Sequence, residues 1–303
     1  MSAAVDVLAV HEEVRTALEE GRPVVAMEST IYSTLGLPVP HNAEALRRCQ
    51  AAVREGGAVP AVTAVVDGRW VVGLAPEQEE RVLHGTRKVA ERDLAVAAAQ
   101  RWDVGVTTVS ASVALAHRAG IEVFATGGIG GVHRGVEVSG DVSADLDALA
   151  QHPVVTVCAG AKSFLDLART LEHLETAGVP VLGWRSDDFP AFYVRSSGLP
   201  VPHRVEDAQS VARVLRHRSR PQTGVLLTVP IPAEDELDPA RHDAALAAAL
   251  RAVDESGITG AAVTPYVLER LGRETEGSSV PANLALAESN ARVAAQVATA
   301  LAG

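Results

Sequence analysis

Residues 123–135 read Val-Phe-Ala-Thr-Gly-Gly-Ile-Gly-Gly-Val-His-Arg-Gly, and residues 154–162 read Val-Val-Thr-Val-Cys-Ala-Gly-Ala-Lys. Each segment opens with an apolar run rich in β-branched residues and ends in a glycine-bearing turn with polar side chains. In an open α/β sheet, ligands bind beyond the carboxyl ends of the strands, where such turns gather. We therefore expect two strands that end at a shared ligand site.

The glycines between Thr126 and Val132 let the backbone approach a ligand closely, so that successive N–H groups can line an anion. Their order is not that of a dinucleotide-binding fingerprint, and no Gly-Lys-Ser/Thr of a nucleotide P-loop follows. A tight bend without any ligand would use the same glycines. His133 and Arg134 follow directly and favour a phosphate-sized anion.

Outside this stretch, strand-like and helix-like segments alternate. The strands that we expect are 23–27, 58–66, 70–74, 105–108, 121–125, 154–158, 180–183 and 224–229. The helices that we expect are 5–20, 42–55, 76–84, 110–119, 144–151, 163–177, 205–218, 240–256, 265–275 and 282–302. Asp67-Gly68 predicts a hairpin turn, and Asn42 is expected to cap its helix. We expect a basic loop at 85–92 and a functional loop, rich in proline and aromatic residues, at 187–202.

This alternation predicts an α/β fold with a largely parallel sheet. The chain has 303 residues, 47% of them hydrophobic and only 3% aromatic, which suits helices packed on such a sheet. We find no linker and expect a single domain over residues 1–303.

The charge and cysteine content exclude several classes of protein. A net charge of −11 without any basic run disfavours nucleic acid or an anionic membrane as a partner, although a local basic pocket remains compatible with a small phosphorylated ligand. The two cysteines are too few for a disulfide framework or a thiolate metal site. Because the sequence shows neither a membrane-length apolar run nor a signal-peptide pattern, we expect a cytoplasmic protein.

Two residues are candidates for covalent and acid–base chemistry. Glu28 follows an apolar strand at the expected ligand edge, where partial burial would raise the pKa of its carboxyl group and suit it to proton transfer. Lys162 lies among small and apolar residues, which favours loss of its proton and attack on an aldehyde to form a Schiff base. An ordinary loop glutamate, and a lysine at a helix start, are the structural alternatives.

Two aspartates precede or begin the helix expected at 144–151. Asp141 is a candidate ligand for a hard divalent cation, with waters completing the shell. Ser143 can cap this helix, and Ser143 and Asp145 can also hydrogen-bond to sugar hydroxyl groups. Lys88 is either a counter-ion for phosphate or a solvated surface charge. The motifs of zinc hydrolases and serine hydrolases are absent.

Taken together, the motifs are specific. They are, in order, Met27-Glu28-Ser29-Thr30-Ile31, Lys88-Val89, Arg92-Asp93-Leu94, Thr107-Thr108-Val109, the run from Phe124 to Gly135, the run from Asp141 to Leu146, the run from Cys158 to Ser163, Thr264-Pro265-Tyr266 and Ala282-Asn283. With these runs the chain resembles the pseudouridine-5′-phosphate glycosidase family, also called indigoidine-synthase-A-like, over about residues 20 to 300.

The resemblance implies a metal-dependent, lyase-type C-glycosidase that reversibly converts pseudouridine 5′-phosphate and water into uracil and ribose 5-phosphate. It also implies an α/β/α sandwich, a homotrimer and one Mn²⁺ per subunit, with Mg²⁺ an alternative. By position, Lys162 matches the Schiff-base nucleophile, Glu28 the proton donor and Asp141 the metal ligand. Substrate-binding positions match Lys88, Val109, Ser143, Ala144, Asp145 and, as a nucleobase contact, Asn283. Some relatives carry a fused sugar kinase, which we do not expect here.

One departure from the family pattern concerns the proposed phosphate site, where Glu91 is expected to place a negative charge. Two other functions stay open at this point. A Schiff-base lyase of aldolase type would use the same lysine on another phosphorylated sugar, and a non-catalytic sugar-phosphate-binding protein would use the same pocket.

Overall fold

The strands of the computed structural model, which describes residues 7–258, 260 and 263–303, follow the expected alternation with helices. They are β1 (Leu8–Val10), β2 (Val24–Met27), β3 (Val59–Val66), β4 (Arg69–Val72), β5 (Lys88–Val89), β6 (Val104–Thr107), β7 (Val123–Ala125), β8 (Val155–Cys158), β9 (Val181–Trp184), β10 (His203–Val205) and β11 (Val225–Thr228).

The helices occupy most of the remaining chain. They are α1 (Glu12–Glu19), α2 (His41–Glu55), α3 (Pro76–Leu83), α4 (Leu94–Ala99), α5 (Val109–Ala119), α6 (Val136–Ser139), α7 (Ala144–Gln151), α8 (Leu167–Ala177), α9 (Ala208–His217), α10 (Pro239–Ser256), α11 (Val263–Glu274) and α12 (Ser279–Ala302).

The sheet has the order β1-β4-β3-β2-β7-β8-β11-β9-β10, and β6 pairs with both β3 and β5. Its central strands from β3 to β10 run parallel, as predicted. The antiparallel pairs of β3 with β4 and β6 make the sheet mixed. The chain leaves β2 towards β3 on one side, whereas β7 leads to β8 on the other. The strand order therefore reverses between β2 and β7, which is where open α/β sheets bind ligands.

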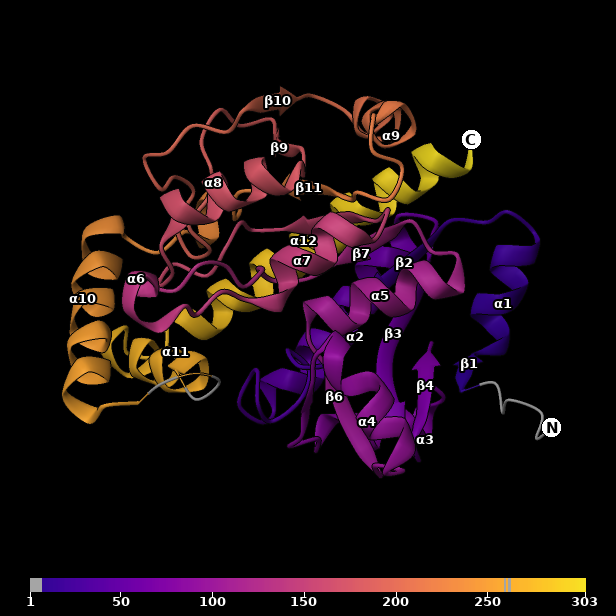
Figure 1. Ribbon diagram of the computed structural model, residues 1–303, viewed down its shortest axis with the longest axis horizontal. Coiled ribbons are helices and arrows are strands. Elements are labelled where there is room, and N and C mark those ends of the chain that lie inside the picture. The colour runs from indigo at the N-terminus through magenta and orange to yellow at the C-terminus, as the bar shows by residue number, and fades with distance from the viewer. Residues whose placement is uncertain (1–6, 259, 261–262) are drawn as a thin grey trace.

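Helices cover both faces of the sheet, so the expected α/β/α layering is confirmed (Figure 1). In this view α5 and α7 lie in front of the central strands, and α12 runs behind them and packs against β2, β7 and β8. Strands β2, β7 and β8 are buried along their whole length, which explains why nearly all their residues are apolar. Helices α10 and α11 pack against each other at the edge of the molecule.

Four predictions of local structure away from the turn at Lys162 were wrong. Residues 8–10, expected to be helical, pair with β4 as a parallel strand, and the helix begins only at Glu12; residues 5 and 6 lie outside the described residues. Asn42 does not cap α2 but lies inside it, where its amide donates to the carbonyls of Tyr32 and Leu83. The loop at 85–92 contains β5.

The fourth error concerns residues 205–207, which precede α9 and include the end of β10. A short edge strand such as β10 has little hydrophobic pattern of its own. Its last residue, Val205, was therefore assigned to the helix that follows. Within the part of the chain that the structure covers, we find no helix that combines the length and the hydropathy needed to cross a bilayer.

Candidate active site

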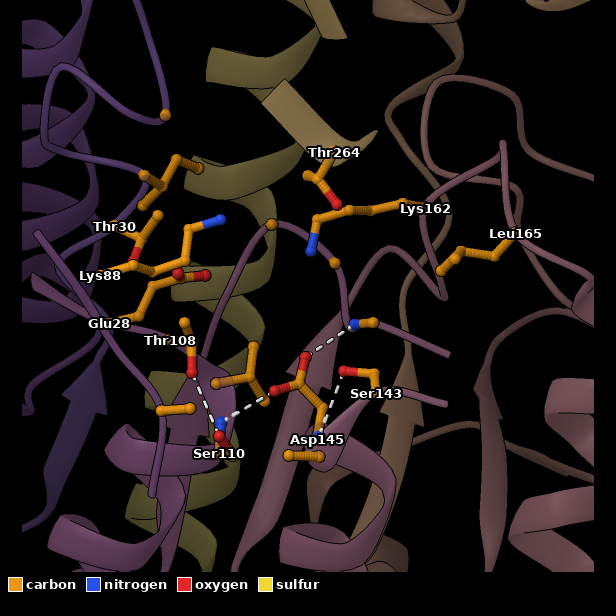
Figure 2. Close-up of a pocket in the computed structure, with 18 of the residues that line it drawn as sticks. Glu28, Thr30, Lys88, Thr108, Ser110, Ser143, Asp145, Lys162, Leu165 and Thr264 are labelled. Carbon is orange, nitrogen blue, oxygen red and sulfur yellow. Dashed lines mark hydrogen bonds between the residues drawn. The ribbon is translucent and has the colours of Figure 1, made fainter. Parts of the chain in front are cut away.

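A cavity of about 260 Å³ lies at the carboxyl edge of the central strands, beside the reversal between β2 and β7 (Figure 2). It is lined by turns that follow β2, β6, β7 and β8, together with residues from α11 and α12. Ten of the predicted site residues line it: Glu28, Lys88, Val109, His133, Asp141, Ser143, Ala144, Asp145, Lys162 and Asn283. Both glycine-bearing turns therefore meet at one cavity, as predicted.

Glu28 follows β2 directly and is only 8% exposed. Burial raises the pKa of its carboxyl group, and the nearby Asp145 adds to that rise, whereas Lys162, a hydrogen bond from Thr126 and Lys88 oppose it. The Thr126 hydroxyl donates to Oε1 of Glu28. A raised pKa keeps a carboxyl group protonated at higher pH, as a proton donor requires.

Thr126 itself is held by the core, so the Glu28 carboxyl group has a fixed partner. Its N–H donates to the carbonyl of Val157 (3.0 Å), and its carbonyl accepts from the amide of Asn290 on α12 (2.8 Å). Sequence reasoning passed over Thr126 as a functional residue. Its only signal was its place between the apolar strand and the glycines of the matched run.

Lys162 ends the turn after β8. Gly160 has φ +76° in that turn, and a Cβ there would lie 2.2 Å from the carbonyl oxygen of Pro190, so the turn requires glycine. The N–H of Lys162 donates to the carbonyl of Ile129 (3.2 Å). This bond links the turn to the segment 127–131 after β7, here called the glycine loop. Figure 2 shows the amine of Lys162 pointing into the cavity, towards the side from which Lys88 and Glu28 enter it.

The residues after Lys162 correct the helix expected at 163–177. They form a turn in which the N–H of Leu165 donates to the carbonyl of Lys162 (3.0 Å), and α8 begins only at Leu167. Asp166 is its N-cap and accepts from the N–H of Arg169 (3.0 Å). Lys162 therefore does not lie at a helix start, which removes the structural alternative considered for it.

Lys88 reaches the cavity from β5, opposite Lys162 (Figure 2). Burial lowers the pKa of its amine, and the nearby amine of Lys162 lowers it further, whereas Glu28 and Asp145 raise it. Arg92, which was not among the predicted site residues, lines the cavity mouth with a largely exposed side chain. Lys88 and Arg92 form a positive wall that suits an anionic group of a ligand.

Glu91 does not place its charge in this wall, contrary to our expectation. Its carboxylate lies 2.8 Å from Nε2 of His152, the C-cap residue of α7, and Glu91 is not among the residues that line the cavity. The main-chain N–H of Glu91 donates to the hydroxyl of Ser110 (3.2 Å), which helps to turn its side chain away.

Asp145 uses both carboxylate oxygens inside the protein. Oδ1 accepts from the N–H of Ser110 at the start of α5 (3.0 Å), and Oδ2 accepts from the N–H of Gly130 (2.8 Å). Ser143 caps α7, as predicted, by accepting from the N–H of Asp145 (3.2 Å). A Cβ on Gly130 would lie 2.2 Å from the Ser143 hydroxyl oxygen. Asp145 thus connects the glycine loop to α5. In its predicted contact with a sugar hydroxyl, the same two oxygens would accept an additional hydrogen bond.

Asp141 and His133 lie together at the cavity wall. Oδ2 of Asp141 is 3.8 Å from Nδ1 of His133, and both side chains are partly exposed. Over the described residues, no cluster of three His, Cys, Asp or Glu side chains is placed to hold a metal ion. The donors present therefore fit only a cation bound by one carboxylate and completed by water and by ligand oxygens.

Asn283 and Phe192 form the wall near the first two glycines of the loop. The amide Nδ2 of Asn283 donates to the hydroxyl of Tyr193 (3.4 Å), and its buried Oδ1 has no hydrogen-bond partner within the described part of the chain. Phe192 comes from the loop at 187–202, so this loop contributes to the lining of the cavity. Its ring packs so closely on Gly128 that a Cβ there would lie 2.6 Å away.

Arg134 is the one predicted site residue that the cavity lining does not include. Its Nε donates to the carbonyl of Phe164 (3.1 Å), so it supports the turn after Lys162. Other cavity residues were missed because Ser, Thr and Leu are common in any loop. Among them are Thr30, Thr108, Ser110, Leu165 and Thr264.

The fold and the cavity define an α/β protein with a lysine- and glutamate-bearing site at the carboxyl edge of its sheet. The chain belongs to the family described as indigoidine synthase A like protein, whose profile matches residues 13–300. It is 51% identical over 296 residues to a pseudouridine-5′-phosphate glycosidase of Myxococcus xanthus (strain DK1622), covering 96% of this chain and 97% of that one. It is 53% identical over 302 residues to one of Roseiflexus sp. (strain RS-1), covering 98% and 96%.

Solved structures agree with this assignment. The prealnumycin C-glycosynthase AlnA, in complex with ribulose 5-phosphate, superposes with a TM-score of 0.89 at 42% identity, covering 97% of both chains. An indigoidine synthase A (IdgA)-like protein from Thermotoga maritima MSB8 superposes with a TM-score of 0.87 at 35% identity, covering 98% of this chain and 97% of that one.

Proposed function

We propose that this chain cleaves the C–C glycosidic bond of pseudouridine 5′-phosphate, reversibly, to give uracil and ribose 5-phosphate through a Schiff base on Lys162. One observation carries the proposal: a lysine amine and a buried carboxyl group with a raised pKa face the same cavity. The names of the relatives support the substrate class.

The chemistry explains why a lysine is needed. In a C-nucleoside the base is joined to the sugar through carbon, so the leaving group lacks a heteroatom lone pair that is easily protonated. A pair of carboxylates, the usual device of glycosidases, suits that bond poorly. A covalent imine offers an electron sink instead.

The proposed reaction has three steps. The uncharged amine of Lys162 forms a bond to C1′ as the C1′–O4′ bond breaks. The new ammonium group then loses one proton and O4′ gains one, so the nitrogen again carries a lone pair. The nitrogen lone pair then forms the C=N bond while the C1′–C5 bond breaks, and uracil C5 receives a proton from Glu28. Water hydrolyses the imine, which releases ribose 5-phosphate and the lysine.

The other residues of the cavity have proposed roles that follow from their charge and position. Lys88 and Arg92 supply positive charge for the phosphate, and His133 on the same lining offers it a hydrogen bond. Arg134 contributes through the turn that it supports. Val109, Ser143, Ala144 and Asp145 are proposed to contact the sugar, and the unpartnered Oδ1 of Asn283 suits an N–H of the base.

We further propose one Mn²⁺ per subunit, with Mg²⁺ as an alternative, held by Asp141 and waters beside His133. When bound, such a cation orients water and neutralises charge on ligand oxygens. We also propose, from the family resemblance, a homotrimer in the cytoplasm.

The direct test is release of uracil from pseudouridine 5′-phosphate. We expect the unchanged protein to release uracil and Lys162→Ala to release none. An absence of uracil from the unchanged protein, with Mn²⁺ supplied, would refute the function. Release of product from another sugar phosphate alone would favour a lyase of aldolase type.

A further inference from the structure

His242 is a buried polar residue on α10, among alanines on the buried face of that helix. The buried face of α10 near its start consists of His242, Ala245 and Ala249, at the spacing of an amphipathic helix. His242 is only 2% exposed, whereas its neighbours Arg241 and Asp243 are exposed. A polar ring at a core position costs free energy unless it is hydrogen-bonded, so its partner explains its presence.

That partner is Ser163, the residue directly after Lys162. Nε2 of His242 lies 3.0 Å from the Ser163 hydroxyl, across 79 residues of sequence. Ser163 is 5% exposed and is not among the residues that line the cavity, whereas Lys162 and Phe164 on either side of it are. The side chain of Lys162 thus faces the cavity, whereas that of Ser163 is buried away from the cavity against His242.

The protonation state of His242 fits this contact. Burial lowers the pKa of the ring, so it is uncharged at neutral pH, although Asp243 partly opposes that shift. Nδ1 lies 3.4 Å from Oδ1 of Asp243. With the ring hydrogen on Nδ1, Nε2 accepts the hydroxyl hydrogen of Ser163.

The same ring also contacts a side chain that is hydrogen-bonded to the cavity residue Asn283. The rings of His242 and Tyr193 lie edge to face, with centroids 6.3 Å apart. The hydroxyl of Tyr193 accepts from the amide of Asn283. One side chain of α10 is therefore linked to the loop of the proposed nucleophile and to the residue proposed to contact the base.

We infer that His242 is a positioning residue: through Ser163 it holds the turn at 162–166 so that the amine of Lys162 stays directed into the cavity. The consequence for catalysis rests on the proposed function, whereas the tether itself does not. Misplacing a reacting group by about 1 Å can lower a rate about 100-fold. Loss of the tether should therefore lower kcat more than it alters KM.

The test uses four single variants of the full chain. Ser163→Ala removes the hydroxyl, His242→Phe keeps a ring without the hydrogen bond, and His242→Gln places an amide near the position of Nε2. Ser256→Ala is the control, because it removes a serine hydroxyl at the exposed end of the same helix. If His242→Phe does not fold, Ser163→Ala decides the question, since it removes a single hydroxyl.

Hydrogen exchange read by mass spectrometry tests the tether without any activity. In Ser163→Ala and His242→Phe, we expect the amides of Leu165 and Asp166 to exchange about tenfold faster, because local opening becomes easier. We expect those of β8 to keep their rates. His242→Gln should lie closer to the unchanged protein, and Ser256→Ala should match it. Unchanged exchange at 165–166 in both Ser163→Ala and His242→Phe would overturn the tether.

Kinetics of uracil release test the consequence. We expect kcat to fall about 10- to 100-fold in Ser163→Ala and His242→Phe, with KM within about threefold, and the double variant to be no worse than either single one. A wild-type kcat in Ser163→Ala, or losses that multiply in the double variant, would overturn the positioning role. If the unchanged protein releases no uracil, the proposed function fails, and the exchange data still judge the tether.

Discussion

Lys162 and Glu28 share a cavity but differ in what their removal should cost. Loss of a general acid lowers a rate by about 10²–10⁴-fold, and a residual proton source, water, remains. Loss of the amine removes the covalent route altogether. We therefore predict that Lys162→Ala lowers uracil release further than Glu28→Ala does, measured by turnover at saturating substrate. Ser256→Ala, an exposed change outside the site, is the control and should keep full turnover. Equal, small losses of turnover in the two site variants would contradict this ranking.

The raised pKa of Glu28 predicts a pH dependence. If Glu28 donates a proton, the rate of cleavage falls as the pH rises through its pKa, because the carboxyl group ionises. Burial moves that fall to a higher pH than an exposed glutamate would give. The pH profile of kcat checks this, with Glu28→Gln expected to lack that limb. A profile whose alkaline limb is identical in both proteins would assign it to another group.

At the scale of single residues, the motifs located the site but not its internal bonds. Glu28, Lys162 and eight further residues were predicted and lie in the cavity lining. The partner of Glu28, Thr126, and the anchoring of Asp145 depend on contacts between strands and loops far apart in sequence. Sequence spacing gives no measure of such contacts, and the role of each site residue stays a prediction.

At the scale of elements, the glycine loop after β7 has a testable steric requirement. A Cβ on Gly130 would lie 2.2 Å from the hydroxyl oxygen of Ser143 and 2.9 Å from Oδ2 of Asp145. We predict that Gly130→Ala loses most activity and lowers the melting temperature. Gly272→Ala in α11 is the matched control, because its nearest neighbour would be 3.8 Å away. Similar behaviour of the two variants would show that the loop accommodates a side chain.

The carboxylate of Asp145 joins this loop to α5. Asp145→Asn replaces one accepting oxygen by an amide that faces an N–H donor. Hydrogen bonds to charged groups contribute about 1.5–3 kcal/mol each, so we predict a loss of about 2 kcal/mol in the free energy of unfolding. Urea denaturation measures it. Asp147→Asn, an exposed change in the same turn of α7, should have little effect, and equal effects would argue against the anchoring role.

Elements with strong local signals were predictable, and those set by partners were not. The Asp67-Gly68 hairpin and α7 with its Ser143 cap follow from turn and cap chemistry. The turn at 163–166 was predicted as the first turn of the helix that follows it. Hydrogen bonds from this segment to the glycine loop and to His242 keep it out of the helix. Strand β5 exists because β6 offers it a pairing edge.

At the scale of the whole molecule, alternation predicted the layers but not the order of the strands. The order β3-β2-β7-β8-β11-β9 follows from which apolar faces fit together in three dimensions. The cavity draws on segments from Glu28 to Asn283, so it exists only once the sheet has assembled. The reversal between β2 and β7 explains why residues so far apart in sequence share one site.

The proposed binding of a metal ion can also be tested on the assembled protein. Because Asp141 is the proposed protein ligand, we predict that a chelator lowers uracil release and that Mn²⁺ restores it. Asp141→Ala should have the low rate with or without Mn²⁺. Binding of Mn²⁺, read by its paramagnetic resonance signal, should weaken in the same variant. Full activity after chelation, or unchanged binding in Asp141→Ala, would contradict the assignment.

The most direct measurement is the mass of the protein after borohydride reduction in the presence of ribose 5-phosphate, followed by mapping of the modified peptide. The account predicts one reduced sugar-phosphate adduct, located on Lys162 and absent from Lys162→Ala, in a protein that also releases uracil from pseudouridine 5′-phosphate. An adduct on another lysine, or uracil release without any adduct, would contradict it.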